Sequence, residues 1–549
     1  MKTKYIAFAA GALMLCSSCV NDLDTLPLNA WDVTSETAYG TDEKSYMQGL
    51  AKLYRTIGTH TLTDISGVDG GATEAIRAFW ACQEITTDEA KCAWGNDAWV
   101  RAMNTNTWSD AENEAVFGVF FRSLQAVSYV NEYLRQTAPG KLSDRGVGPE
   151  VAAKVEQFRC EARFIRAFYY WMAMDVFGAV PFTTENSPFG AEAPTQASRE
   201  QVYAFIVSEL EALAADGSAM PAPRSNYPRA DKGSVLGLLS RVYLNAGVYN
   251  GAPEWELCQK TCERLFKMGY SLCPEYSDLF RGDNGENPDA LNELIFAVDY
   301  DNDNAQSYGG TSFLTLAAIN GDDMKDAGGN EILPNGVNGS WAGIRTTHEF
   351  AEKYFGVANP DYATGAYDVT DKRGKFFLIR AHEESVENQL YEFKYGWGCI
   401  KFNNIPHDMT EAEFRATAKT KAYSDIDFPV IRLGEIYLTY AEACLKLNQT
   451  GKGLPYLKLL AERAGVPTSS LSSYDEDYLL AERARELMWE SHRRTDLIRY
   501  GKFTSDDFLW PYKGGDEFAG QKFPDYKALF AIPASQLRAN PNLKNPEGY

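Results

Sequence analysis

Residues 161–182, EARFIRAFYYWMAMDVFGAVPF, are the stretch that most constrains the fold of this 549-residue chain. Together with the residues just before it, this stretch places on one stripe Phe158, Ala162, Ile165, Tyr169 and Met172. Apolar residues three, four and seven positions apart share one face of an α-helix. The spacing therefore predicts a helix whose apolar face is buried against other elements.

Further along the chain the same helical periodicity returns. In residues 433–445 it is carried by Leu433, Ile436, Tyr437, Tyr440, Ala441, Cys444 and Leu445, and residues 480–488 repeat it. In LGLLSRVYLNAG, residues 236–247, small residues stand beside leucines, which favours stacked helix pairs of the tetratricopeptide kind, although no clean 34-residue period is present. We therefore expect a mostly α-helical protein.

Between residues 281 and 425 the character of the sequence changes. Gly, Asn and Asp become frequent, which predicts long loops with short strands. The aromatic residues Tyr300, Tyr308, Trp341 and Trp397 argue against disorder in this region. Because no Pro/Ser-rich linker or low-complexity break is present, we expect the helical and loop-rich parts to pack as one body.

The first residues, MKTKYIAFAAGALMLCSSC, have the pattern of a lipoprotein signal. A basic start is followed by an apolar run over residues 5–15, too short to span a bilayer, and by two serines directly before Cys19. This pattern predicts a signal peptide at residues 1–18 and a lipid on Cys19, which would hold the mature chain at a membrane surface. Ordinary secretory cleavage is the alternative.

Charge narrows the range of partners. The formal net charge is −22, and removal of residues 1–18 takes away two lysines and no acid, so it becomes −24. A chain this acidic repels phosphate backbones, which argues against nucleic acid as a partner. Since basic patches for lipid headgroups are also missing, we expect the lipid alone to supply the membrane attachment.

Motifs of catalysis and cofactor binding are absent. The five histidines form no HExxH pattern, and the chain has no P-loop, GxGxxG or GxSxG, so we predict a protein without enzymatic activity, cofactor or metal. An all-α glycosidase is an alternative that the missing motifs do not exclude, because the two catalytic carboxylates of such an enzyme need not be close in sequence. The segment DYDNDN, residues 299–304, could bind calcium, but it lacks EF-hand spacing, and a solvated acidic loop is the favoured interpretation.

Two further features have structural interpretations. Residues 480–501, LAERARELMWESHRRTDLIRYG, crowd opposite charges at helical spacing, which predicts an ion-pair network rather than an active site. The eight cysteines after Cys19 have no paired CxxC spacing, so we expect buried thiols. The pair Cys82 and Cys92 is the one disulfide worth testing.

Several segments, in order, resemble the SusD/RagB family of Bacteroidetes outer-membrane nutrient-binding lipoproteins. They are the acidic start NDLDTLPL after Cys19, EARFIRAFYYWMAMDVFGAVPF, LGLLSRVYLNAG, FPVIRLGEIYLTYAEACLKLN, the charged block at 480–501 and the ending AIPASQLRANPNLKNPEGY. The resemblance covers essentially all of 19–549, divided into an N-terminal part (19–280) and a C-terminal part (281–549). Two positions depart from the family pattern: Ser491 stands where a Gly is usual, and Lys544 where a Gln is common.

The resemblance implies a SusD-like fold with four tetratricopeptide-like helix pairs and an added loop-rich region. It also implies no enzymatic activity, binding of glycans at the outside of the outer membrane, and association with a TonB-dependent transporter of the SusC type. A mainly structural lid on that transporter, with little glycan affinity of its own, is an alternative within the same family.

The stretch TDEAKCAWGNDAWV, residues 87–100, sets two indoles among polar residues. An aromatic ring stacks on the C–H face of a sugar while polar groups bond its hydroxyls, so Trp94 beside Asn96 and Asp97 suits a sugar platform. Trp99 is expected to pack inward.

Within the family, the chain is most similar to the starch-binding branch. That resemblance implies a glycan site made of Arg77, Trp94, Asn96 or Asp97, Tyr308 before Gly309 and Gly310, and Trp341. Because curved aromatic arcs suit helical α-glucans, starch or malto-oligosaccharide is the expected ligand, with another glycan as the alternative.

Overall fold

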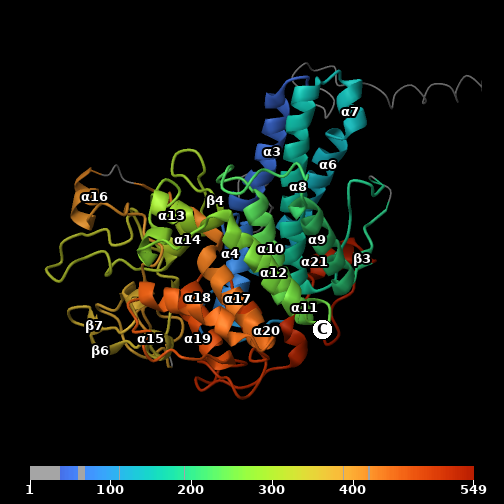
Figure 1. Ribbon diagram of the computed structural model, residues 1–549. Coiled ribbons are helices and arrows are strands. Elements are labelled where there is room, and N and C mark those ends of the chain that lie inside the picture. Colours follow the sequence, from blue (N-terminus) through green and yellow to red (C-terminus); the bar gives the residue numbers. More distant parts are fainter. Residues whose placement is uncertain are drawn as a thin grey trace, which may run out of the picture.

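The computed structural model describes residues 38–59, 69–110, 112–188, 190, 192–387, 389–417 and 421–549. The predicted signal peptide and Cys19 lie outside these residues. Within them the protein is mostly α-helical, as predicted, and Figure 1 shows a broad body from which a bundle of helices projects. None of the helices in the described part of the chain is long and apolar enough to cross a bilayer.

The N-terminal helices are α3 (Glu43–Gly58), α4 (Ala75–Trp80), α5 (Ala98–Asn104), α6 (Glu114–Gln136), α7 (Pro139–Asp144) and α8 (Pro149–Phe177). Of these, α3, α6, α7 and α8 form the projecting bundle, and α4 lies in the body (Figure 1). A five-residue π-helical segment, Ala81–Ile85, extends α4. Helix α8 is the helix predicted from residues 161–182, and its apolar stripe is buried against α3, α6 and α9 (Arg199–Ala214).

The remaining helices continue the body. They are α10 (Lys232–Leu244), α11 (Ala246–Tyr249), α12 (Trp255–Leu265), α17 (Leu433–Lys446), α18 (Thr450–Arg463), α19 (Glu476–Leu487), α20 (Arg493–Arg499) and α21 (Ala534–Ala539). Helices pack in pairs: α6 with α8, α9 with α10, α10 with α12, and α17 with α18. The predicted stacking of helix pairs is therefore confirmed.

The loop-rich region contains short strands, as predicted, and several short helices. β4 (Leu294–Val298) pairs antiparallel with β10 (Phe428–Arg432), and β1 (Lys91–Cys92) pairs antiparallel with β5 (Ile344–Arg345). Two further pairs of this region join β6 (Ala358–Asp361) to β7 (Ala366–Asp368), and β8 (Phe377–Leu378) to β9 (Gly398–Cys399). Outside the region, β2 (Val180–Pro181) pairs with β3 (Gln196–Ala197). The short helices of this region are α13 (Pro288–Glu293), α14 (Gly310–Ala317), α15 (His348–Phe355) and α16 (Glu411–Thr417).

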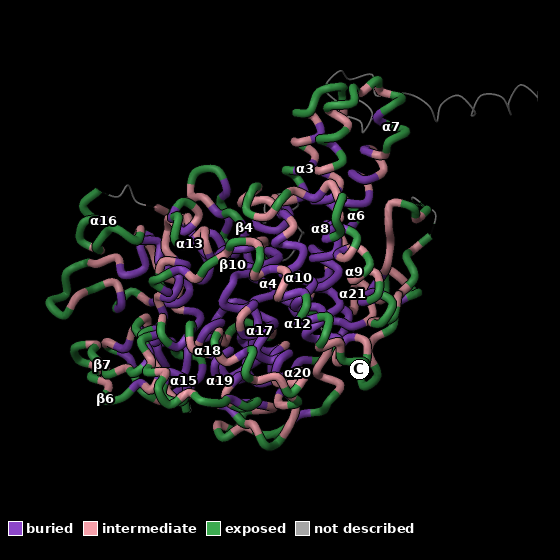
Figure 2. Tube along the Cα trace, in the orientation of Figure 1, coloured by how far each residue is buried: buried purple, intermediate pink, exposed green. Residues whose placement is uncertain are grey.

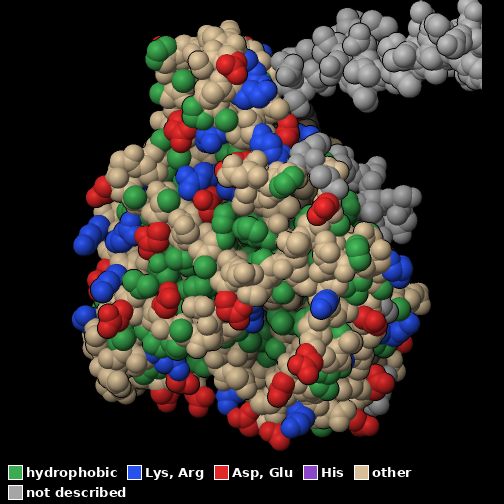
Figure 3. Space-filling view, turned by 90° about the vertical axis from the view of Figure 1, so that its right-hand side faces the viewer, with side chains coloured by type: hydrophobic (Ala, Val, Ile, Leu, Met, Phe, Trp, Pro, Cys, Tyr) green, Lys and Arg blue, Asp and Glu red, His purple; other side chains and the backbone are tan. Residues whose placement is uncertain are grey.

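A continuous hydrophobic core runs through the interior of the body. Exposed residues are concentrated at the periphery of the body and at the outer end of the helical projection (Figure 2). On the face drawn in Figure 3, acidic and basic side chains are interspersed with small groups of hydrophobic ones. The eight cysteines among the described residues are all buried free thiols, including Cys82 and Cys92, so the structure does not contain the disulfide considered from the sequence.

The charged block at 480–501 forms a buried ion-pair network, as predicted. Arg432, 1 % exposed, contacts Glu486 at 2.6 Å, Glu490 at 2.6 Å and Glu293 at 2.8 Å. Burial by itself would raise the pKa of Glu486, but the surrounding guanidiniums outweigh burial and hold that pKa well below its usual range. Burial of charges this deep is compensated only when each one is paired.

The same block fixes the segment that precedes Trp94. Arg493 contacts Asp88 through two hydrogen bonds of 2.7 and 2.8 Å. The backbone N–H of Trp489 donates to Glu89 at 2.9 Å. Residues from the C-terminal part of the chain therefore position the loop that carries Trp94.

Two non-glycine residues of this block, Trp489 and Ser491, have φ in the left-handed region. Ser491 has φ of +67°, in the left-handed region, and is 8 % exposed. Its hydroxyl oxygen is buried without a hydrogen-bond partner among the described residues. A left-handed conformation costs an L-residue roughly 1–2 kcal/mol, a cost that glycine does not incur.

We predict that Ser491→Gly stabilises the protein by roughly 0.5–1 kcal/mol, since relief of strain exceeds the added flexibility of the unfolded chain. Equilibrium urea unfolding of the soluble 20–549 fragment measures the effect. Gly501, with the same φ of +67° and open space around its Cα, is the reverse control, and Gly501→Ala should destabilise by a similar amount. A Ser491→Gly variant no more stable than the parent would contradict the strain.

We predict that Arg432→Met destabilises the protein by roughly 3–5 kcal/mol, because it leaves buried carboxylates without their partner. Lys260→Met is the matched control: Lys260 and Glu256 form a pair whose side chains are 66 % and 74 % exposed, so its loss should change stability by less than about 0.5 kcal/mol. Both variants are compared by urea unfolding. Equal losses in the two variants would contradict the structural role of the network.

Candidate functional site

A surface depression of about 650 Å³ lies where α4, the loop after β1 and the loop-rich region meet. Its lining consists of Asp69, Ala72, Arg77, Trp94, Asp97, Trp99, Glu114, Tyr308 and Trp341. The structure thus brings five of the six residues predicted for glycan binding to one place. The sixth, Asn96, is exposed and does not belong to the lining.

The two central indoles are held by backbone pairing. Next to the β1–β5 ladder, the N–H of Ala93 donates to the carbonyl of Gly343 at 2.7 Å, and the Trp94 indole N–H donates to the carbonyl of Trp341 at 3.2 Å. A Cβ atom on Gly343 would lie 2.5 Å from the Trp94 ring. Glycine at this position therefore lets the indole lie directly against the backbone.

The backbone that carries Trp341 is fixed to the end of α14. The N–H of Trp341 donates to the carbonyl of Leu316 at 2.7 Å, and the N–H of Gly343 donates to that of Ala317 at 2.8 Å. A side chain on such a braced segment loses little freedom when a ligand binds.

Two tilted rings follow Trp341: that of Tyr308, which lines the depression, and that of Tyr423, which neighbours Tyr308 but is not part of the lining. The Tyr308 ring, 45 % exposed, lies 6.0 Å from that of Trp341 at an interplanar angle of 53°. Tyr423, from the segment before β10, lies 4.8 Å from Tyr308 at 42°. Trp341, Tyr308 and Tyr423 form what we call the aromatic arc, in which each ring is tilted relative to its neighbour rather than lying in the same plane.

Glu74 ties the N-terminal helices to the loop that carries Tyr308. This fully buried carboxylate caps α4 by accepting from the N–H of Arg77 at 2.7 Å. It also accepts from the Tyr300 hydroxyl at 2.7 Å and from the N–H of Gly310 at 3.1 Å. Burial raises the pKa of Glu74, while the hydrogen bonds it accepts favour the ionised form.

The two glycines after Tyr308 are explained by this contact. A Cβ on Gly309 would lie 2.5 Å from Glu74, and one on Gly310, whose φ is +45°, would lie 2.0 Å from the Tyr300 ring. Only glycine allows the chain to pass this close, so Tyr-Gly-Gly is a structural requirement of the turn.

Arg77 contacts the backbone of Tyr308, a member of the aromatic arc. Its guanidinium, 8 % exposed, lies 4.3 Å from the Phe313 ring centre and donates to the carbonyl of Tyr308 at 3.1 Å. Burial lowers its pKa, and the carboxylates of Asp69, Glu74 and Glu114 oppose that shift. Arg77 therefore fixes Tyr308 and also presents a donor toward the depression.

Three carboxylates line the rest of the depression. They come from Asp69, Asp97 and Glu114. Burial raises the pKa of Glu114, and the neighbouring Asp69 and Asp97 raise it further. The lining therefore offers hydrogen-bond acceptors for hydroxyl groups beside aromatic faces.

The structure corrects and extends the sequence-based prediction. Trp99, in the first turn of α5, was expected to pack inward; it is only partly buried, packs against the core and also lines the depression. Tyr423 was missed, and its isolated position before β10 gave no sequence signal. Asp69 and Glu114 were missed because nothing in their local sequence distinguishes them from the other acidic residues of the chain.

The acidic loop at 299–304 forms a turn of its own. Asp301 accepts from the N–H of Asp303 at 2.9 Å and from the N–H and side-chain amide of Asn304. Its carboxylate is thus engaged within the loop, as a solvated turn requires. Within the described residues, the one grouping of His, Cys, Asp and Glu side chains with ligand-like convergence is elsewhere, at Asp283, His407 and Asp408.

Two family models match the chain: "SusD family" over residues 292–549 and "Starch-binding associating with outer membrane" over residues 59–244. The chain is 29 % identical to the starch-binding protein SusD of Bacteroides thetaiotaomicron, with both proteins covered completely. It is 23 % identical to a SusD-like protein of Bacteroides ovatus, over 93 % of this chain and 84 % of that protein.

Solved structures share the fold. A SusD superfamily protein from Parabacteroides distasonis superposes with a TM-score of 0.68 at 18 % identity, over 94 % of this chain and all of that one. Surface glycan-binding protein A from Bacteroides thetaiotaomicron, solved with laminarihexaose, gives 0.67 at 18 % identity, over 92 % of this chain and 99 % of that one. These structures show that the fold is shared, and the two family models, over residues 59–244 and 292–549, show that the chain belongs to the SusD/RagB family.

Proposed function

We propose that this protein binds starch or malto-oligosaccharides in the depression formed by Trp94, Trp99, Trp341 and Tyr308. The observation that carries the proposal is the aromatic arc, set beside carboxylates and Arg77 on braced backbone. Aromatic faces stack on sugar C–H patches while the polar groups bond the hydroxyl rim. The full-length similarity to a starch-binding protein supports the same ligand class.

The shape of the arc favours an α-glucan over a flat β-linked chain. Successive rings are tilted by 53° and 42°, so a ligand that stacks on all three must turn as it passes. An α-1,4-glucan coils and presents consecutive glucose units at successive angles, whereas an extended β-1,4 chain presents parallel faces. A ring set of this curvature therefore suits a coiled glucan.

The proposed cellular role rests on the N-terminus and the family. Cys19 would carry the lipid anchor in the outer membrane, with the protein on the cell exterior, and the bound glycan would pass to a SusC-like TonB-dependent transporter. Neutral sugars impose no charge requirement, so the strongly acidic chain is compatible with this ligand. The protein would act as a binder, without cleaving the glycan.

Affinity electrophoresis of the soluble 20–549 fragment tests the ligand. Native gels contain amylopectin, pullulan, dextran, levan or xylan, and retardation only with α-1,4-linked glucans is expected. Retardation by a different polysaccharide would contradict starch as the ligand but not the proposed glycan site. No retardation in any gel, together with co-purification of the full chain with a large membrane β-barrel, would favour the transporter-lid alternative. New reducing ends from an α-glucan would indicate a glycosidase.

We predict that Trp94→Ala and Trp341→Ala each weaken maltoheptaose binding by about 1–3 kcal/mol, or about 5- to 150-fold, through lost stacking and burial. Isothermal titration calorimetry measures the affinity. Trp255→Ala in α12 is the matched control, since this indole is also half-buried but lies outside the depression, and it should leave the affinity unchanged. Unchanged affinity in both site variants would rule out the proposed site.

We predict that Tyr423→Ala weakens binding of long maltodextrins by about 0.5–1.5 kcal/mol, because the third ring of the aromatic arc is lost. Tyr423→Phe keeps the ring and should retain most of the affinity. Titrations with maltotriose and maltoheptaose measure the difference, which is expected mainly for the longer ligand. Full affinity of Tyr423→Ala for both ligands would show that the arc ends at Tyr308.

A further inference from the structure

A second group of side chains converges on the surface away from the aromatic arc. It joins Asp283, which follows the 3₁₀ turn Tyr276–Phe280, to His407 and Asp408 in a loop more than 100 residues later. One potential ligand atom from each residue lies within 4.8 Å of the other two. We call Asp283, His407 and Asp408 the 283/407/408 cluster.

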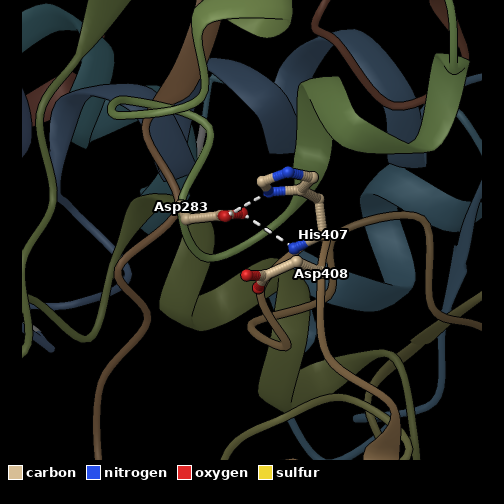
Figure 4. A group of neighbouring side chains, drawn as sticks. All are labelled: Asp283, His407 and Asp408. Carbon is tan, nitrogen blue, oxygen red and sulfur yellow. Dashed lines mark hydrogen bonds and ion pairs between the residues drawn. The ribbon is translucent and has the colours of Figure 1, made fainter.

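The cluster is held in place by its own backbone. Figure 4 shows the Asp283 carboxylate between the imidazole ring and the backbone nitrogen of His407, with the Asp408 carboxylate beside it. Asp283 accepts from the N–H of His407 at 3.0 Å, and its other oxygen lies 2.5 Å from the Nδ1 atom of the ring. The imidazole and the first carboxylate are therefore oriented toward each other before any ion arrives.

We propose that the 283/407/408 cluster binds one divalent transition-metal ion, with Zn²⁺ as the preferred ion. The ion would replace the proton shared by His407 Nδ1 and Asp283, and Asp408 would complete a set of one nitrogen and two carboxylate ligands. Zinc binds imidazole nitrogen and carboxylate oxygen at about 2.0–2.2 Å, so the 2.5 Å contact must open to about 3.4 Å around a tetrahedral ion.

The ligand types select against calcium and magnesium. Both of those ions prefer oxygen ligands, calcium six to eight of them, and the cluster supplies only two carboxylates and one imidazole. Three protein ligands match a zinc site that keeps one position for solvent. The side chains of His407 and Asp283 are 38 % and 20 % exposed, so an ion can enter directly from water.

The surrounding charge is mixed. Asp278 adds a further negative charge to the environment of His407, and Arg281 acts on Asp278 and Asp283 with the opposite sign. The two carboxylate ligands with Asp278 outnumber the single guanidinium. The local balance therefore remains favourable for a cation.

The position of the cluster indicates which segments a bound ion would hold together. In the segment just before His407, the N–H of Asn404 donates to the carbonyl of Asn335 at 2.9 Å, and its side-chain oxygen accepts from the N–H of Asp425 at 2.6 Å. These partners precede Trp341 and follow Tyr423 in the chain. An ion that joins Asp283 to His407 would thus stiffen the loop-rich region behind the aromatic arc.

The test measures metal binding by the untagged, chelator-treated 20–549 fragment. Zn²⁺, Ca²⁺ and Mg²⁺ chlorides are titrated separately by calorimetry, and bound metal is counted by mass spectrometry after dialysis. We expect one Zn²⁺ per chain, a rise in thermal unfolding temperature with Zn²⁺ alone, and slower proteolysis within residues 281–425. His407→Ala and Asp283→Asn should each weaken Zn²⁺ binding at least about tenfold.

His348→Ala is the matched control. His348 also has two acidic neighbours, but Glu384 lies 3.4 Å from Nδ1 and Glu352 lies 3.8 Å from Nε2, so they flank opposite ring nitrogens. This variant should keep full Zn²⁺ affinity. The proposal is overturned if the parent binds no Zn²⁺, if Ca²⁺ binds more tightly, or if His407→Ala binds Zn²⁺ as the parent does. None of these outcomes depends on glycan binding.

Discussion

The buried carboxylate of Glu74 is the contact on which the rest of the site depends. It caps α4, receives the Tyr300 hydroxyl and fixes the backbone of Gly310, so one side chain joins the helical N-terminal part to the loop-rich region. A buried charge is stable only when hydrogen bonds replace its lost hydration, and here the donors include the N–H groups of Arg77 and Gly310 and the hydroxyl of Tyr300. Arg77 and Tyr308, from either side of this contact, therefore face the same depression.

A second constraint comes from the C-terminal block. Its arginines and carboxylates are almost completely buried, and their pairing extends to Asp88 and Glu89 just before Trp94. Such a network adds little stability compared with an apolar core, but it strongly disfavours any arrangement that leaves a charge unpaired. The charged block at 480–501 therefore helps to position the N-terminal loop that carries Trp94.

The sequence predicted much of the fold and part of the site, for physical reasons. The stripe through Tyr169 and Met172 fixes α8 because helical periodicity is a local property. Trp94, Tyr308 and Trp341 were predicted from their polar and glycine-rich surroundings together with family resemblance. Tyr423 and Trp99 were not, since their places at or beside the depression depend on how segments distant in sequence meet. Asn96 was included, but it is exposed and lies outside the lining. The 283/407/408 cluster was not predicted because Asp283 is far in sequence from His407 and Asp408.

The most direct test of the account is a crystal structure of the 20–549 fragment with maltoheptaose. The account predicts ordered glucose units stacked across Trp94, Tyr308 and Trp341, following the turn of the three-ring arc toward Tyr423, with hydroxyls on Asp97 and Arg77. Ordered sugar at another surface, with the depression filled only by water, would contradict it.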